Sequence, residues 1–130
     1  MNSQTAFKKT RLGLPLHRTV ADVMTKHVHV AGPEASFKTL ARLIGENRVG
    51  AIPIVDQKGV PIGIVSQANL ILQGNVASDV MSSPATTVAA DTLVSEASRL
   101  MQNKTVRHLV VVDQRGRIAG IVSRTNMLRD

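Results

Sequence analysis

Residues 63–69 read Gly-Ile-Val-Ser-Gln-Ala-Asn, and residues 120–126 read Gly-Ile-Val-Ser-Arg-Thr-Asn. The second stretch begins 57 residues after the first, and the same offset aligns the flanking sequence without a gap. Further matches are Asp-Val-Met at 22–24 and 79–81, Arg-Leu at 42–43 and 99–100, and Val-Asp-Gln-x-Gly at 55–59 and 112–116. The chain therefore holds two copies of one unit. Because a unit of this length buries too little apolar surface to fold alone, we expect the copies to stack on each other.

Both copies predict the same order of secondary structure. Thr19 and Asn75 are candidate N-caps of a short helical turn that opens each copy. An extended segment, a helix with a buried stripe, two strands joined by an Asp–Gly turn and a last short helix follow. Their expected positions are 27–30, from 33, 52–55, 62–65 and from 66 in the first copy, and 86–88, from 91, 109–112, 118–122 and from 123 in the second. Apolar strands with helices between them predict an α/β (α+β) fold in which helices cover a sheet.

The composition is that of an ordinary globular protein, because 43% of the 130 residues are apolar and 19% are charged. The length predicts one domain, or two half-domains that share a core. The absence of Cys excludes disulfides and thiolate metal sites and fits a reducing compartment. The first residues do not have the pattern of a secretory signal, and no apolar run approaches the ~20 residues that span a bilayer. We therefore expect a cytoplasmic protein without a membrane segment.

More than half of the net charge of +7 lies in residues 1–18, which contain Lys8, Lys9, Arg11 and Arg18 and no acid. These are four of the 16 basic side chains, so the rest of the chain has 12 against 9 acidic ones. Single-stranded nucleic acid is bound on aromatic side chains, but this chain has only two Phe and no Trp or Tyr. We therefore expect no nucleic-acid partner. Polyanion binding through a basic N-terminal arm is kept as an alternative function.

The repeated stretch carries the clearest binding chemistry. A strand leads into a helix start, where Ser66 or Ser123 lies beside backbone N–H groups that have no partner within the helix. Such a helix start can hold a phosphate, and the glycine that begins each stretch leaves room for a ligand or for a close backbone. Asn69 and Asn126 follow three residues later, where they could bond a ribose hydroxyl. The alternative is that Ser and Asn satisfy only the helix start itself.

Taken together, these motifs resemble a known family. The order Asp-Val-Met, a helix, Val-Asp before a turn and Gly-h-h-Ser-x-x-Asn (h apolar) is similar to the CBS domain, named after cystathionine β-synthase. Two such units in tandem resemble a Bateman module, and the resemblance covers residues 19–130. It implies two βαββα repeats packed with pseudo-two-fold symmetry, one at 19–74 and one at 75–130, behind the basic arm at 1–18. Val110 stands where the family often has Pro, as Pro53 does in the first copy, and we expect this difference to alter only the entry of the strand.

The resemblance also implies where a ligand binds. In CBS pairs that bind adenosine nucleotides, the Ser or Thr and the acid three residues later hold the ribose and the adjacent phosphate, and aliphatic side chains of both repeats sandwich the adenine. The first cleft implied for this chain consists of Thr25, Val28, Val49, Gly50 and Ala51 with Ile121, Ser123, Thr125 and Asn126. The second consists of Ser82, Ala85, Val106, Arg107 and His108 with Ile64, Ser66, Ala68 and Asn69.

One departure from the family weakens the nucleotide interpretation. The family usually has Asp where this chain has Asn69 and Asn126. An amide offers one acceptor oxygen and a donor, whereas a carboxylate accepts from both ribose hydroxyls. The loss of charge-assisted hydrogen bonds costs on the order of 1 kcal/mol per site.

Basic side chains in the lead-in to the second strand are the candidates for phosphate contacts. They are Arg48 in the first copy and the Arg107-His108 pair in the second, where the family often carries basic residues; the alternative is that they are solvated or paired with acids. His27 and His29 would lie on one face of a strand, as two metal ligands do. Without Cys or a nearby acidic motif we expect no metal site, and solvent exposure or a place in a pocket wall is the alternative.

The sequence contains no nucleophile motif, no Walker-type or dinucleotide glycine loop and no paired carboxylates at helical spacing. We therefore expect no enzyme and no required cofactor. The resemblance implies a regulatory module that binds AMP, ADP, ATP, S-adenosylmethionine or NAD between its repeats and relays a change to a fused or separate effector protein. It also implies a homodimer formed through exposed helices. The alternative from another class is a ligand-free interaction and dimerisation scaffold.

Overall fold

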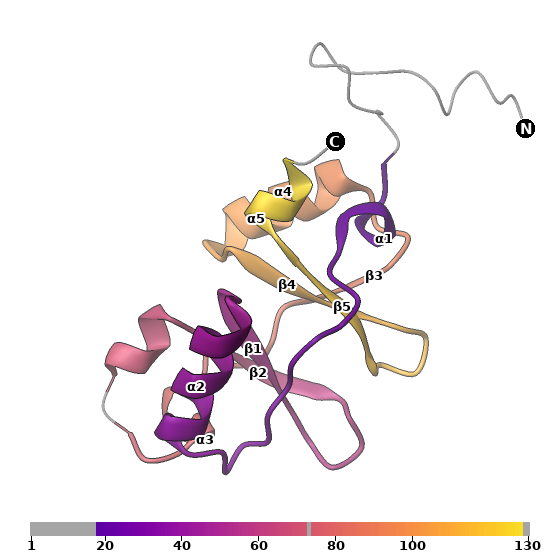
Figure 1. The fold of residues 1–130 in the computed structure, drawn as a ribbon. Coiled ribbons are helices and arrows are strands. Elements are labelled where there is room, and N and C mark those ends of the chain that lie inside the picture. The colour runs from indigo at the N-terminus through magenta and orange to yellow at the C-terminus, as the bar shows by residue number, and fades with distance from the viewer. Residues whose placement is uncertain (1–17, 73, 129–130) are drawn as a thin grey trace, which may run out of the picture.

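The structure is a computed structural model, and it describes residues 18–72 and 74–128 (Figure 1). The basic arm expected at 1–18 lies, except for Arg18, outside the described residues. The first copy contains α1 (Val20–Val23), α2 (Phe37–Asn47), β1 (Ala51–Val55), β2 (Pro61–Ser66) and the 3-10 helix η2 (Ala68–Ile71). The second contains α3 (Ala77–Val80), β3 (Thr87–Ala89), α4 (Val94–Lys104), β4 (His108–Val112), β5 (Ile118–Ser123) and α5 (Arg124–Met127). The predicted α/β class is confirmed.

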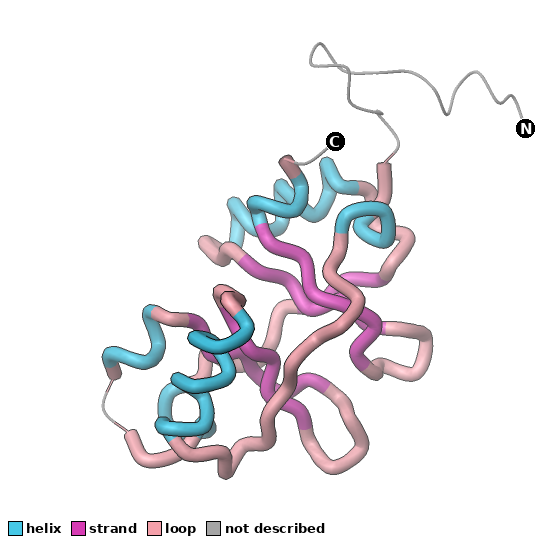
Figure 2. Tube along the Cα trace, in the orientation of Figure 1, coloured by secondary structure: helices cyan, strands magenta, loops and turns pink. Residues whose placement is uncertain are grey.

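The strands form two small sheets, and the helices lie in two groups toward opposite ends of the molecule, α2 with α3 and α1 with α4 and α5 (Figure 2). β1 pairs antiparallel with β2, and β4 pairs with β5 in the same way. The predicted Asp–Gly turns join both pairs, with Gly59 and Gly116 at φ values of 82° and 80°. In each turn the aspartate closes the loop, since Asp56 Oδ1 accepts from the N–H of Lys58 and Asp113 Oδ1 from that of Arg115, both at 2.8 Å.

The two copies differ in their first strand. In the second copy β3 pairs parallel with β4, and the Val110 N–H donates to the Thr86 carbonyl at 3.0 Å. The residue equivalent to Val110 in the first copy is Pro53, which has no N–H to donate. The strand expected at 27–30 is therefore absent, and only a bridge between Ala31 and Ile54 remains. The Pro–Val difference thus removes the first strand of the first copy, which is more than the altered entry that we expected.

The long helices begin later than predicted. α2 is capped by Ser36, whose Oγ accepts from the Thr39 N–H at 3.1 Å, and α4 begins after Leu93. The residues just before each helix are held extended by hydrogen bonds to the other copy. Before α2, the carbonyls of Pro33 and Ala35 accept from the N–H groups of Ser78 and Ala77, respectively. Before α4, the carbonyls of Ala90 and Thr92 accept from the N–H groups of Ala21 and Val20, respectively. These long-range bonds delay the helix start that the local sequence signals.

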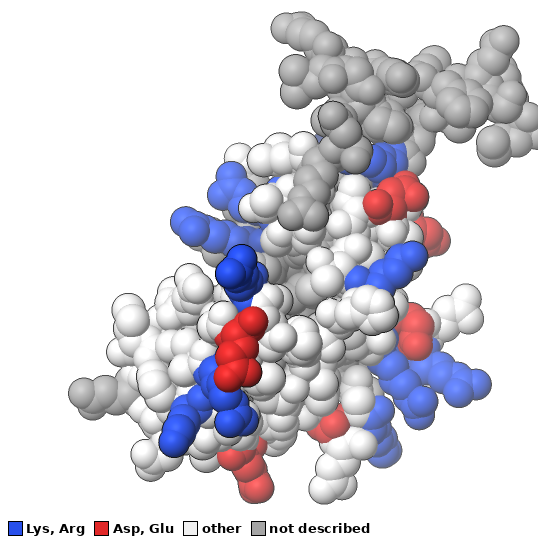
Figure 3. Space-filling view, in the orientation of Figure 1, with Lys and Arg blue, Asp and Glu red and all other residues white. Residues whose placement is uncertain are grey.

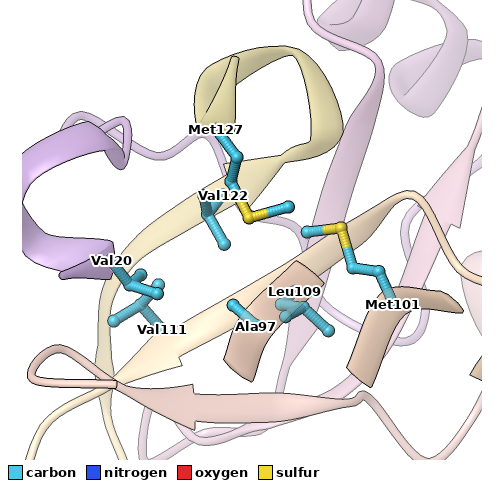
Figure 4. Packing of buried hydrophobic residues seen from close by; sticks show 7 residues of the cluster. All are labelled: Val20, Ala97, Met101, Leu109, Val111, Val122 and Met127. Atoms are coloured by element: carbon cyan, nitrogen blue, oxygen red, sulfur yellow. The ribbon is translucent and has the colours of Figure 1, made fainter. Parts of the chain in front are cut away.

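The opening helix of each copy packs into the core of the other. Val20 of α1 is fully buried among side chains of the second copy, as Figure 4 shows. The other buried members of this cluster are Ala97, Met101, Leu109, Val111, Val122 and Met127. Ala77 and Val80 of α3 likewise complete the first copy's cluster, whose remaining buried members are Leu40, Ile44, Ile52, Ile54 and Val65. The chain therefore has two cores, and each draws side chains from both copies.

An aspartate in the first turn caps each opening helix. Thr19 caps α1, and its N–H donates to Asp22 Oδ2 at 2.8 Å. In the second copy the N-cap is Val76, one residue after the expected Asn75, and the Asp79 carboxylate accepts from the N–H groups of both residues.

Among the described residues, no helix is long and apolar enough to cross a membrane.

Candidate ligand-binding clefts

Two adjoining clefts lie where the copies meet. The first has a volume of about 320 Å³ and the second of about 760 Å³. All nine residues that the resemblance assigned to the first cleft line it together, as does Arg48. Eight of the nine assigned to the second line that cleft, and Ala85 does not. Each cleft therefore combines an opening segment and a strand lead-in of one copy with a strand end of the other.

Backbone hydrogen bonds between the copies hold the opening segment of each copy against the last strand of the other. Thr25 exchanges two hydrogen bonds with Ile121, at 2.9 and 3.0 Å, and Ser82 does the same with Ile64. A Cβ added to Gly120 would lie 2.8 Å from the Thr25 carbonyl oxygen, and one added to Gly63 would lie 3.0 Å from that of Ser82. The glycines that begin the repeated stretches thus admit a crossing backbone, which was one of their two expected uses.

The Ser–Asn pairs are engaged within their own turns. In the second copy, Asn126 Oδ1 accepts from the N–H and Oγ of Ser123 at 2.9 and 3.0 Å, and Ser123 Oγ accepts from the Asn126 N–H at 3.1 Å. Ser66 and Asn69 repeat this arrangement. A backbone N–H can only donate, so the amide oxygen must face it. The pairs therefore form the self-satisfied helix start that we considered as an alternative, and only the NH2 group of each amide is left for further partners.

Because both amide oxygens are engaged, Asn69 and Asn126 can bind a ligand only through their NH2 groups. Asn69 Nδ2 donates to Ser82 Oγ at 3.3 Å, a residue of the other copy. Asn126 is 9% exposed and is the buried polar side chain of the described core. An NH2 group donates to oxygen and cannot accept from a hydroxyl. The asparagines therefore suit ligand oxygen atoms, such as those of a phosphate, better than ribose hydroxyl hydrogens.

The clefts are lined by cationic side chains and by no Asp or Glu among the described residues. Arg48 lines the first cleft and follows α2 in the left-handed region, at a φ of 54°. Arg107 and Arg124 line the second, and the Arg124 N–H donates to the Arg107 carbonyl at 3.1 Å. In Figure 3 Lys and Arg side chains stand on both copies and at the junction between them. This lining favours an anionic ligand.

His108 contributes to both clefts. Its half-buried ring packs on Gly50, where an added Cβ would lie 2.9 Å from Nε2. Burial lowers the pKa of His108 below its ordinary value of 6.5, and the positive charge of Arg107 lowers it further. Gly50, Ser123 and Thr125 also line both clefts, so the two are continuous.

Several lining residues were missed by the sequence reasoning. Gln67, Thr105 and Arg124 line the second cleft, and His108 also lines the first. Thr105 could have been found, because it is the equivalent of Arg48 in the repeat. His27 and His29 both line the first cleft, which agrees with the place in a pocket wall that we considered for them. In the described part of the chain no three His, Asp or Glu side chains are grouped to hold a metal ion.

The chain is similar in sequence to known proteins. A family model described as CBS domain matches residues 20–73 and again 77–130. An uncharacterized protein of Methanopyrus kandleri is 33% identical over 120 residues, which are 85% of this chain and 61% of that protein. The chain spans 24% and 38% of two further curated relatives, so it corresponds to less than two thirds of these proteins.

Two solved structures show the same arrangement. The crystal structure of CBSX2 of Arabidopsis thaliana in complex with AMP has a TM-score of 0.79 and 30% identity, over 86% of this chain and 94% of that one. The cytosolic domain of the Mg2+ channel MgtE in complex with ATP has a TM-score of 0.73 and 27% identity, over 86% and 48%.

Proposed function

Because the chain belongs to the CBS domain family, as a tandem pair of repeats, we propose that it is a regulatory module that binds an adenosine nucleotide in the clefts between the repeats. The observation that carries the proposal is the first cleft, which is lined by the nine residues implied by the resemblance and by Arg48, and by no Asp or Glu of the described part of the chain. Similar chains support the ligand class, since CBSX2 was solved with AMP and the MgtE domain with ATP.

The lining offers a separate place for each part of a nucleotide. Val28, Val49 and Ile121 are aliphatic side chains between which an adenine ring would lie, in a chain with almost no aromatic residues. The NH2 group of Asn126 and the guanidinium of Arg48 would donate to phosphate oxygens. In the second cleft Arg107 and Arg124 would take the part of Arg48.

Ligand binding would regulate by changing how the two repeats sit against each other. Each cleft is lined by both repeats, so a bound nucleotide contacts both. It can shift their arrangement only to the extent that its affinity differs between two arrangements. A fused or separate effector protein would read this shift, and the module itself would catalyse nothing and require no cofactor.

Homodimerisation is the second part of the proposal. Ile71 and Leu128 occupy equivalent positions at the ends of η2 and α5, and they are 84% and 80% exposed. Two large aliphatic side chains exposed at matched positions favour burial against a second copy. Ile71→Ser with Leu128→Ser should give a monomer by light scattering, whereas Val30→Ser, at an exposed residue away from these helices, should leave the dimer intact.

Isothermal calorimetry with AMP, ADP, ATP, S-adenosylmethionine and NAD tests the nucleotide proposal. We expect binding of at least one phosphate-containing ligand, and a loss of about five- to tenfold in affinity for Arg48→Gln in the first cleft and for Arg124→Gln in the second. Lys58→Gln, in the exposed turn between β1 and β2, is the matched control. Silence from all five ligands at millimolar concentration, with an intact dimer, would refute the sensor and favour the scaffold.

The basic arm supplies a further comparison. Removing residues 1–17 keeps Arg18, whose guanidinium donates to the Met127 carbonyl. Nucleotide affinity should survive this deletion, because the clefts draw on residues 25–126. Polyanion binding that is lost with residues 1–17 would assign a separate function to the arm.

A further inference from the structure

His108 stands at the boundary between the two clefts, and we propose that it is a specificity-determining residue that takes up a proton when an anionic ligand binds. Affinity for anionic ligands then rises as the pH falls, whereas affinity for neutral or cationic adenosine compounds does not. The inference rests on the proposed function for the ligand class. Its geometry requires only that an anion enters either cleft.

The position of the ring carries the inference. His108 occupies the first place in β4, where the first copy has Ala51. Its ring lies on Gly50, which has no side chain to hold it away, and both residues line both clefts. Among residues 18–72 and 74–128 no hydrogen bond engages the ring. The ring nitrogens are therefore left to a ligand in either cleft.

The permanently charged side chains that line the two clefts together with His108 are all arginines, and two further histidines line the first cleft. Arg107 precedes it in the chain, Arg124 lines the second cleft, and Arg48, His27 and His29 line the first. No Asp or Glu of the described chain lines either cleft, so nothing in the empty protein compensates a proton on His108. Burial and Arg107 accordingly hold its pKa below 6.5. The ring is neutral at pH 7 while the clefts are empty.

An anionic ligand reverses this balance. A phosphate in either cleft stabilises the imidazolium, so the pKa of His108 is higher in the complex than in the free protein. The complex then binds more protons, and affinity rises as the pH falls between the two pKa values. A rise of one pKa unit makes binding up to tenfold tighter below that window than above it. Above the bound-state pKa the affinity does not depend on this residue.

NMR titration of the His108 ring tests the inference directly on the wild-type chain. The pKa is measured in the free protein, with AMP, with the neutral compound 5′-methylthioadenosine and with inorganic pyrophosphate. The expected result is a free pKa below 6.5, a higher one with AMP and with pyrophosphate, and no rise with 5′-methylthioadenosine. His108→Gln assigns the resonance.

Calorimetry in buffers of different ionisation enthalpy adds a second readout. Proton uptake on AMP binding should be larger in the wild type than in His108→Gln, and the difference removes any proton taken up by AMP itself. Lys58→Gln, in the exposed turn outside both clefts, should retain the larger uptake, and His27→Gln measures the share that belongs to another ring of the first cleft. Gly50→Ala should displace the ring, since its Cβ would lie 2.9 Å from Nε2, and should bring the free pKa closer to 6.5.

The outcomes separate the two proposals. If pyrophosphate raises the pKa while none of the five adenosine ligands binds, the role of His108 stands and the nucleotide proposal fails. If AMP binds without raising the pKa, or the proton uptake disappears in His27→Gln and not in His108→Gln, the inference is overturned. It is also overturned if neither AMP nor pyrophosphate raises the pKa.

Discussion

Replacing Val20 by Ala should destabilise the second repeat, although Val20 belongs to the first. The side chain is fully buried and packs in a cluster with Leu109, Val111 and Val122 of the other copy. Truncation removes two methyl groups, each worth about 0.8 kcal/mol on transfer from water, and leaves a cavity that the helix turn fills only in part. We expect a loss of about 2–3 kcal/mol in the free energy of unfolding.

Native-state hydrogen exchange locates the loss. In Val20→Ala the amides of β4 and β5 should lose more protection than those of β1 and β2. Val80→Ala is the reciprocal change, because Val80 lies in α3, is 3% exposed and packs with Ile52 and Ile54 of the first repeat. Its effect should fall mainly on β1 and β2. Denaturant titration gives the total free energy for each variant.

Val30→Ala is the control, since this residue is 41% exposed and should change stability by less than about 0.5 kcal/mol. The reasoning would be refuted if Val20→Ala and Val80→Ala lowered protection in the same strands. It would also be refuted if each acted on its own repeat. Either pattern would mean that the opening helices are not exchanged between the cores.

Two further predictions concern caps. Thr105 ends α4 at a φ of 55°, a left-handed conformation that is strained for a β-branched residue, so Thr105→Gly should raise the free energy of unfolding by about 0.5–1 kcal/mol in a thermal or denaturant melt. An unchanged or lower melting temperature would show that no strain is stored there. Hydrogen bonds from the N–H groups of Asn75 and Val76 lower the pKa of Asp79 below 3.8, so their contribution is present above that pH and is lost as the pH falls through the lowered pKa. Asp79→Asn should therefore reduce the melting temperature at pH 7 and much less at about pH 2.5, and an equal reduction at both would contradict the assignment.

Local patterns predicted the strands well because each hairpin is a local structure. The strands expected at 52–55 and 109–112 are found as β1 and β4, each with one more residue at its start. Errors arose where distant backbone groups compete with local signals. The helix starts expected at 33 and 91 were wrong, because hydrogen bonds to the other copy hold these segments extended. The offset between the copies already showed that Pro53 is the equivalent of Val110. The loss of the strand at 27–30 could be recognised only from the structure, in which the second copy pairs β3 parallel with β4 and the first copy has no such pair.

Comparison of the two copies could not predict that the opening helix of each copy packs in the core of the other. The two copies are similar, so a pattern that places Val20 on a buried face fits either core equally well. Which core it enters depends on the path of the chain between residues 25 and 31, and the extended pattern predicted at 27–30 does not determine that path. The clefts met the same limit, since the orientation of the Asn126 amide and the packing of His108 on Gly50 arise from contacts between distant segments.

The segment that carries α1 connects the first cleft to the core of the second repeat. Thr25 lines the first cleft and bonds to Ile121 of the other copy, while Val20, five residues earlier on the same segment, is buried in that copy's core. Residues 20–25 and Ile121 therefore belong to one packed unit, whereas Val49, which also lines the first cleft, packs on the other core. Packed cores resist small internal displacements, so a ligand that changed the distance between these walls would move the two cores as units. Under the proposed function we therefore expect the two cores to shift against each other, each together with the opening helix of the other repeat.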